Sequence, residues 1–201
     1  MKVLTPEVVK AFWSYMCKHY GTTAVNKPKS AEMKIAAHAL ELMGIMDASD
    51  FLSEFSTTVG ERIYIPFKPG DTFKVSLVDQ AAICVHEHVH VRQFKHAQFI
   101  GEYCLDSSKR ALYECEAYRA SMETSFYLVK DYPSPKAIAE SLKAYNCNEK
   151  DRMFAKKYLT QASAIVRRGG VVTPETKVAK AWLEKVALSA IAGCVAAQGR
   201  E

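Results

Sequence analysis

Residues 82–94 read Ala82-Ile83-Cys84-Val85-His86-Glu87-His88-Val89-His90-Val91-Arg92-Gln93-Phe94. His86 and His90 stand four positions apart, and residues with that spacing lie on one face of a helix, one turn from each other. Both imidazoles can therefore reach one metal ion. Glu87, directly after the first histidine, completes the pattern His-Glu-x-x-His. Zinc is the usual metal of this pattern, and its glutamate acts as a general base on water.

The motif lies on a predicted helix that begins near residue 79 and ends at about residue 95. Projection at 100° per residue places His86, Glu87 and His90 on one broad side, which we expect to face the interior. His88 points roughly opposite to the other two histidines and falls on the narrow polar side of the helix. Despite its place inside the motif, His88 is therefore not expected to bind the same metal ion.

A third ligand is needed, because a catalytic zinc ion usually has three protein ligands and one open position. A second long helix, predicted from Ser107 or Ser108 to Lys130, offers two carboxylates. Glu114 borders the apolar side of this helix, whereas Glu116 falls on a side that resembles a solvated charged face. Glu114 is therefore the predicted third ligand, and Glu116 is the alternative.

Together these residues resemble the gluzincin branch of the His-Glu-x-x-His metallopeptidases. In that family a glutamate from a downstream helix completes a His, His, Glu zinc site and commonly begins a short pattern with a small residue three positions later. Glu114-Cys115-Glu116-Ala117 matches that pattern. The next position, where the family often has a carboxylate or amide that orients a histidine ligand, holds Tyr118. Asp106, Tyr118 or a backbone carbonyl is then the candidate for this task.

The resemblance covers about residues 62–129 and implies a zinc-dependent metallopeptidase with a zincin-like core. It implies one zinc ion held by His86, His90 and Glu114, and a peptide or protein as substrate. A zinc-bound water would attack the peptide carbonyl, with Glu87 as general base. A further donor would stabilise the developing oxyanion, and the candidates for it are Tyr118, Tyr103, Arg119 and Tyr127. The alternative is a catalytically inactive protein of the same fold, with a structural metal site that serves as a binding module.

The fold class that we expect is α+β and mainly helical, with a small antiparallel sheet packed on the motif helix. Residues 62–67 and 73–78 are rich in β-branched and aromatic side chains and flank the turn sequence Lys68-Pro69-Gly70-Asp71, which predicts a hairpin. Pro66 would place the first strand at a sheet edge, because proline has no N–H for the ladder. Such an edge, around Tyr64-Ile65, could pair with an extended peptide.

Capping patterns predict helices on both sides of this core. Thr5-Pro6-Glu7 begins the first helix, which ends near Gly21, and a second helix runs from Ser30 to a cap at Gly44. Three more helices begin at Ser134-Pro135, Asn148-Glu149 and Thr173-Pro174, and the last has Leu183, Val186, Leu188 and Ile191 as its expected core contacts. We expect a single domain over residues 1–201, in which residues 134–201 could form a helical subdomain.

Composition excludes several classes of protein. The net charge is +5, but the basic residues are dispersed, so we expect solvated helix faces and no nucleic-acid partner. The six cysteines have no spacing typical of a disulfide framework, which favours free thiols in a reducing compartment. No stretch approaches the ~18 apolar residues of a membrane span, and the N-terminus lacks the apolar stretch of a signal peptide. We therefore expect a cytoplasmic protein without a membrane partner, in an oligomeric state that the sequence leaves open.

Overall fold

The structure, a computed structural model, describes the backbone of residues 4–42 and 47–198 and the side chains up to residue 187. It is mainly helical, with a small three-stranded sheet. The elements in chain order are α1 (Pro6–Tyr20), β1 (Thr23–Asn26), η1 (Lys27–Lys29), α2 (Ala31–Leu42), α3 (Ala48–Ser53), β2 (Thr57–Val59), β3 (Arg62–Ile65), α4 (Leu77–Phe94), α5 (Phe99–Leu105), α6 (Ser107–Val129), α7 (Pro135–Ser141), η2 (Leu142–Tyr145), α8 (Glu149–Val166) and α9 (Pro174–Gln198).

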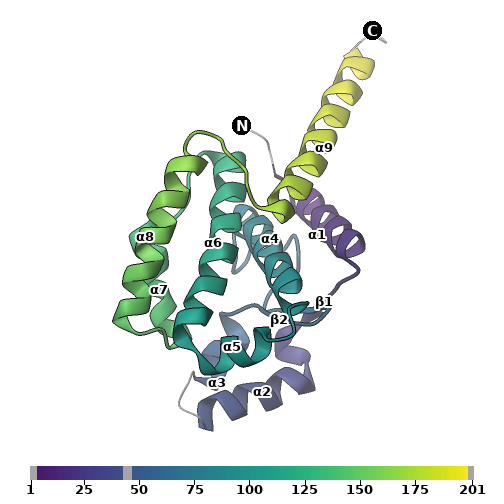
Figure 1. The fold of residues 1–201 in the computed structure, drawn as a ribbon. Helices are drawn as coiled ribbons and strands as arrows, with labels where there is room; N and C mark the ends of the chain where they lie inside the picture. Colours follow the sequence, from purple (N-terminus) through teal and green to yellow (C-terminus); the bar gives the residue numbers. More distant parts are fainter. Residues whose placement is uncertain (1–3, 43–46, 199–201) are drawn as a thin grey trace.

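Helices α4 and α6 lie side by side at the centre of the molecule (Figure 1). Helix α4 carries the histidine motif and is capped by Ser76, whose hydroxyl accepts from the N–H of Asp79. Helix α6 is capped by Asp106, whose carboxylate accepts from the N–H groups of Ser108 and Lys109. The predicted caps Ser107 and Ser108 are therefore wrong by one or two positions. Because Asp106 holds the start of α6, it does not orient a histidine.

The apolar core lies on both sides of this helix pair. Helices α1 and α9 pack against α4, and helices α7 and α8 continue the body beyond α6 (Figure 1). The first cluster includes Phe12, Met16, Val85, Val89 and Leu183. The second includes Cys115, Met122, Ile138, Leu142 and Leu159. The motif helix is therefore enclosed by other elements, and most of its side chains are buried, polar ones included.

The sheet has the strand order β1-β3-β2 and is mixed, so the predicted antiparallel sheet is only partly correct. Strand β1 pairs in parallel with β3, and β2 pairs antiparallel with β3. The hairpin is thus formed by β2 and β3, so the predicted hairpin of residues 62–67 with 73–78 is wrong. The predicted edge position of β3 is also wrong, because β3 is central and Pro66 lies just beyond its last residue, where no ladder N–H is needed.

Gln80 explains why residues 73–78 do not form a strand. Its fully buried side chain accepts from the N–H of Gly70 at 2.8 Å and donates to the carbonyls of Asp71 (2.6 Å) and Val75 (2.8 Å). The loop before α4 thus obtains its hydrogen bonds from one amide rather than from a neighbouring strand. Gly70 has φ 87°, and a Cβ there would lie 2.6 Å from the carbonyl oxygen of Pro6, so the loop fits against α1 only with glycine at this position.

Lys27 anchors the start of β2. Its side chain is fully buried, and its Nζ donates to the carbonyl of Phe55 at 2.9 Å and to Thr57 Oγ1 at 2.6 Å. The ammonium also lies 3.4 Å from the centre of the Phe51 ring. Burial lowers the pKa of Lys27 to about 7, and the negative charge of Glu87 opposes this shift. Strand β2 is therefore fixed by a side chain as well as by β3.

Most of the remaining sequence-based expectations are confirmed. Helix α1 ends at Gly21 with φ 67°, and α7, α8 and α9 begin at the predicted caps. Cysteines 17, 84, 104, 115 and 147 are free. Leu183 is buried, whereas Gly44 and the side chains of Leu188 and Ile191 lie outside the described residues. Within residues 4–42 and 47–198, no helix is both long and apolar enough to cross a membrane.

We expect Gln80→Leu to lower the free energy of unfolding by about 3 kcal/mol, because three hydrogen bonds are lost and the backbone groups of the loop lose their partners. Urea denaturation measures this change. Gln161→Leu on the exposed side of α8 is the matched control, with an expected change within about 0.5 kcal/mol. Equal unfolding midpoints for the two variants would contradict this role of Gln80.

Candidate metal centre

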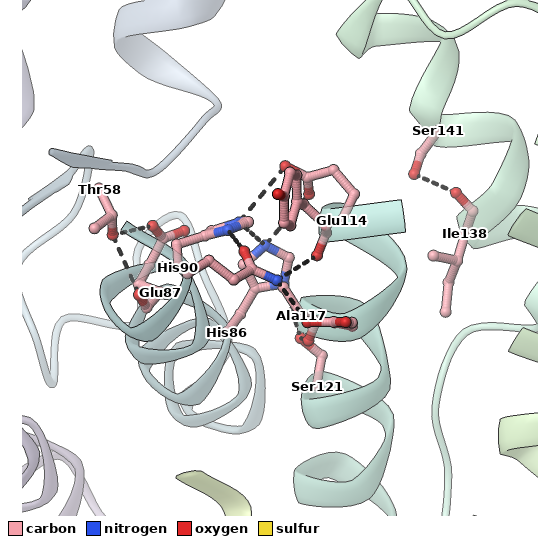
Figure 2. A network of polar contacts seen from close by, with 12 residues as sticks. Thr58, His86, Glu87, His90, Glu114, Ala117, Ser121, Ile138 and Ser141 are labelled. Carbon is pink, nitrogen blue, oxygen red and sulfur yellow. Dashed lines mark hydrogen bonds and ion pairs between the residues drawn. The ribbon is translucent and has the colours of Figure 1, made fainter. Parts of the chain in front are cut away.

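Three predicted ligands meet between α4 and α6. His86 Nε2 and His90 Nε2 are 3.1 Å apart, and each lies 3.5 Å from a different carboxylate oxygen of Glu114. Both histidines are 8% exposed and Glu114 is fully buried. Figure 2 shows the two rings pointing toward the carboxylate from the neighbouring helix. Among the described residues, this is the group of side chains that could hold a metal ion.

The distances fit a metal ion. Nitrogen and oxygen ligands lie about 2.0–2.2 Å from zinc, so a tetrahedral site separates neighbouring ligand atoms by about 3.3–3.6 Å. The two imidazole nitrogens are 3.1 Å apart, and each lies 3.5 Å from its nearer oxygen of Glu114, His86 from Oε2 and His90 from Oε1. In addition, Glu114 Oε2 is buried without a hydrogen-bond partner. A buried carboxylate oxygen without a partner is costly, and a bound cation would satisfy it.

The outer nitrogens of both histidines have fixed partners. His86 Nδ1 lies 3.3 Å from Ser121 Oγ, which itself donates to the carbonyl of Ala117, so the ring N–H donates to the serine. His90 Nδ1 lies 2.8 Å from Gln93 Oε1 and donates to it. With both protons on Nδ1, the two Nε2 atoms turn lone pairs toward each other. The two lone pairs repel each other, and a cation between them would be bound by both nitrogens.

The pKa values of His86 and Glu114 are shifted in opposite directions. Burial lowers the pKa of His86, but the hydrogen bond and charge of Glu114 outweigh it, so that the pKa lies above its ordinary value. Burial raises the pKa of Glu114, but the charge of His90 and the contact with His86 bring that pKa below its ordinary value. Both shifts reflect the attraction between the Glu114 carboxylate and the two imidazoles packed against it.

Glu87 is held beside the ligands by β2. Its Oε2 accepts from Thr58 Oγ1 at 2.8 Å, and its side chain is buried. The same hydroxyl lies 3.3 Å from the backbone carbonyl of Glu87 (Figure 2). Thr58 belongs to β2, which is an edge strand and packs on α4. The edge strand next to the site is therefore β2, whereas the sequence pointed to β3.

His88 faces away from the metal cluster. It is fully buried, with Nδ1 2.7 Å from the carbonyl of Cys84 and Nε2 3.1 Å from Thr22 Oγ1. Its ring also packs against Tyr20, with centroids 5.0 Å apart. Burial lowers the pKa of His88 to about 4, so it is neutral near pH 7. It thus points away from the other two histidines as predicted, but it lies in the core rather than on a polar surface.

Glu116 lies outside the ligand group. Its Oε2 accepts from Gln93 Nε2 at 3.0 Å and lies 3.9 Å from Arg92. Since Gln93 also accepts from His90, Glu116 is connected to the site through one intervening amide. The alternative third ligand of the sequence analysis is thus placed one side chain away from the metal position.

Two tyrosines complete the surroundings of the site. The Tyr118 ring lies edge-on to His86, with centroids 4.9 Å apart, and burial raises its pKa to about 12. The Tyr103 hydroxyl donates to Glu114 Oε1 at 2.5 Å. Burial, followed by the charge of Glu114, raises the pKa of Tyr103 well above its ordinary value. Both side chains therefore remain protonated hydrogen-bond donors.

Sequence reasoning missed the supporting contacts of Thr58, Gln93 and Ser121. Gln93 follows His90 by three positions, so helical spacing could have identified it. Ser121 was not among the residues predicted to contact a ligand. Thr58 gave no signal, because it lies in a three-residue strand whose position depends on distant parts of the chain.

Comparisons with protein-family models, with curated protein sequences and with solved structures give no match for this chain. Its function is therefore inferred from the residues and geometry of the site alone.

We expect Glu114→Gln to lower zinc affinity at least 100-fold, because an anionic ligand is lost. Glu116→Gln is the matched control on the same helix, and its effect should stay within about 10-fold because it acts only through Gln93. Competition with a chromogenic chelator measures both affinities. Equal losses in the two variants would contradict the assignment of Glu114.

We expect His88→Ala to keep one metal ion per chain, because its ring points away from the ligands. The free energy of unfolding should fall by about 2 kcal/mol, since the variant loses two buried hydrogen bonds and leaves a cavity beside Tyr20. Metal analysis after dialysis and urea denaturation give the two values. Loss of the metal from a folded His88→Ala variant would place His88 in the site.

Proposed function

We propose that this chain is a zinc-dependent metallopeptidase of the gluzincin type, with a zincin-like core built on α4, α6 and the sheet. The observation that carries the proposal is the buried His86, His90 and Glu114 cluster with Glu87 held beside it by Thr58. Two imidazoles and one carboxylate are a donor set typical of catalytic zinc. The short distances between the two imidazole nitrogens (3.1 Å) and from each of them to the carboxylate (3.5 Å) support one shared ion.

The donor set favours a catalytic site over a structural one. Structural zinc sites are usually closed by four ligands, with cysteine thiolates prominent among them. Cys84 and Cys115 are buried near α4 and α6, yet neither belongs to the ligand group. Three protein ligands leave one position for water, and a glutamate fixed beside them has no purpose in a structural site.

A bound zinc ion would polarise the peptide carbonyl and lower the pKa of the attacking water from 15.7 towards about 7. Glu87 would then accept the proton from the attacking water and deliver it to the leaving amine as the peptide C–N bond breaks. The hydrogen bond from Thr58 fixes Oε2 of Glu87 and leaves Oε1 for the proton. His86 and His90 are kept in one tautomer by Ser121 and Gln93. Of the candidate donors to the developing oxyanion, we propose Tyr118, because its ring packs edge-on against His86 while the Tyr103 hydroxyl is bonded to Glu114.

The substrate that we propose is a peptide or protein in extended form. Strand β2 has β3 on one side only and is the last strand in the sheet order. No strand of the described residues pairs with its other edge, and we propose that the peptide adds there through main-chain hydrogen bonds. Because Thr58 belongs to this strand, a peptide paired with it would lie close to Glu87.

The test is zinc loading followed by cleavage of a broad peptide library, read by mass spectrometry. We expect Glu87→Gln to keep its zinc and to lose at least 100-fold in cleavage rate, because the proton acceptor is gone. Glu61→Gln, at the exposed turn between β2 and β3, is the control with unchanged cleavage. Full zinc loading without any cleavage would instead support an inactive protein that uses the metal site as a binding module.

A further inference from the structure

The two oxygens of Glu114 have different surroundings. Oε1 accepts a hydrogen bond from the hydroxyl of Tyr103 at 2.5 Å. Oε2 is buried and has no hydrogen-bond partner. Each oxygen also lies 3.5 Å from one histidine nitrogen, Oε1 from His90 and Oε2 from His86. Oε1 is thus the oxygen that a hydrogen bond holds, and Oε2 is the one without such a bond.

Helix α5 places Tyr103 firmly in this position. Arg110 Nη1 donates to the backbone carbonyls of Tyr103 (2.5 Å) and Cys104 (3.2 Å), and these bonds tie the end of α5 to the start of α6. The Tyr103 ring also packs on Phe99, with centroids 5.5 Å apart. The hydroxyl therefore has little freedom to leave Glu114.

We propose that Tyr103 is a positioning residue that makes Glu114 bind the metal ion through Oε2 alone. The inference rests on the proposed metal centre. A carboxylate that binds through both oxygens fills two coordination positions, whereas Tyr103 engages one oxygen and reduces Glu114 to a single ligand atom. With His86 and His90, the protein then supplies three ligand atoms, which preserves the open position that a catalytic ion requires.

A reciprocal contact between the same two helices provides a matched control. Tyr113 of α6 donates its hydroxyl to Glu102 of α5, whereas Tyr103 of α5 donates to Glu114 of α6. Glu102 does not belong to the ligand group. Tyr113→Phe and Tyr103→Phe therefore delete equivalent tyrosine–glutamate hydrogen bonds, and the second alone touches the metal position.

The experiment loads the full chain and both variants with Zn²⁺ and, separately, with Co²⁺. We expect Tyr103→Phe to lower Zn²⁺ affinity about 10–100-fold in chelator competition, because the carboxylate loses its fixed orientation. Its Co²⁺ visible absorption should also weaken, since five-coordinate Co²⁺ absorbs less strongly than four-coordinate Co²⁺. Tyr113→Phe should keep the affinity and the spectrum of the unchanged chain.

The outcomes separate the two proposals. If the unchanged chain binds neither ion, the metal centre itself is refuted. If the unchanged chain binds both ions, the role of Tyr103 is overturned by a folded Tyr103→Phe variant that keeps its Zn²⁺ affinity and its Co²⁺ spectrum. Equal effects of Tyr103→Phe and Tyr113→Phe would overturn it as well. Should Tyr103→Phe fail to fold, Arg110→Lys loosens the carbonyl contacts while keeping the hydroxyl. A folded Arg110→Lys variant with full affinity and an unchanged spectrum then overturns the proposal.

Discussion

The packing of α4 against α6 is the contact on which the candidate site depends. It brings two imidazoles from one helix and a carboxylate from the other into a largely buried space. Buried polar groups must find partners, or the fold loses stability. Ser121, Gln93 and Tyr103 supply partners on the outer side of the cluster. The inner side lacks such partners, and this asymmetry is what marks the cluster as a place for a cation.

Local pattern was sufficient for α1, α2, α4 and α6 to α9, though not for the short helices α3 and α5, and it was sufficient for the candidate ligands. Histidines four positions apart share a face wherever a helix forms, and Glu114 borders the apolar side of its own helix. Local pattern did not predict the pairing of the strands in the sheet. Residues 73–78 have the composition of a strand, yet Gln80 supplies the hydrogen bonds of the loop that they belong to. Strand β1 pairs with β3 across almost forty residues of chain, and no local signal marks such a pairing.

The same distinction applies to the side chains around the ligands. Gln93 acts within one turn of His90, so its role can be read from spacing. Thr58 and Tyr103 come from a three-residue strand and a seven-residue helix, which are too short to carry a clear periodic pattern. Their positions follow from tertiary contacts, including the anchoring of β2 by Lys27 and of α5 by Arg110. The residues that would bind the metal were therefore predictable, and most of those that orient them were not.

The hydrogen bond from Thr58 to Glu87 has a consequence for selectivity. If a peptide aligns along β2, the strand that receives the substrate also holds the proton acceptor. A peptide that fits badly and shifts the strand would displace Glu87 as well, even where the metal ligands stay in place. Peptides would then differ more in their rate of turnover than in their strength of binding. A peptide that aligns poorly with β2 would also slow the proton transfer by Glu87.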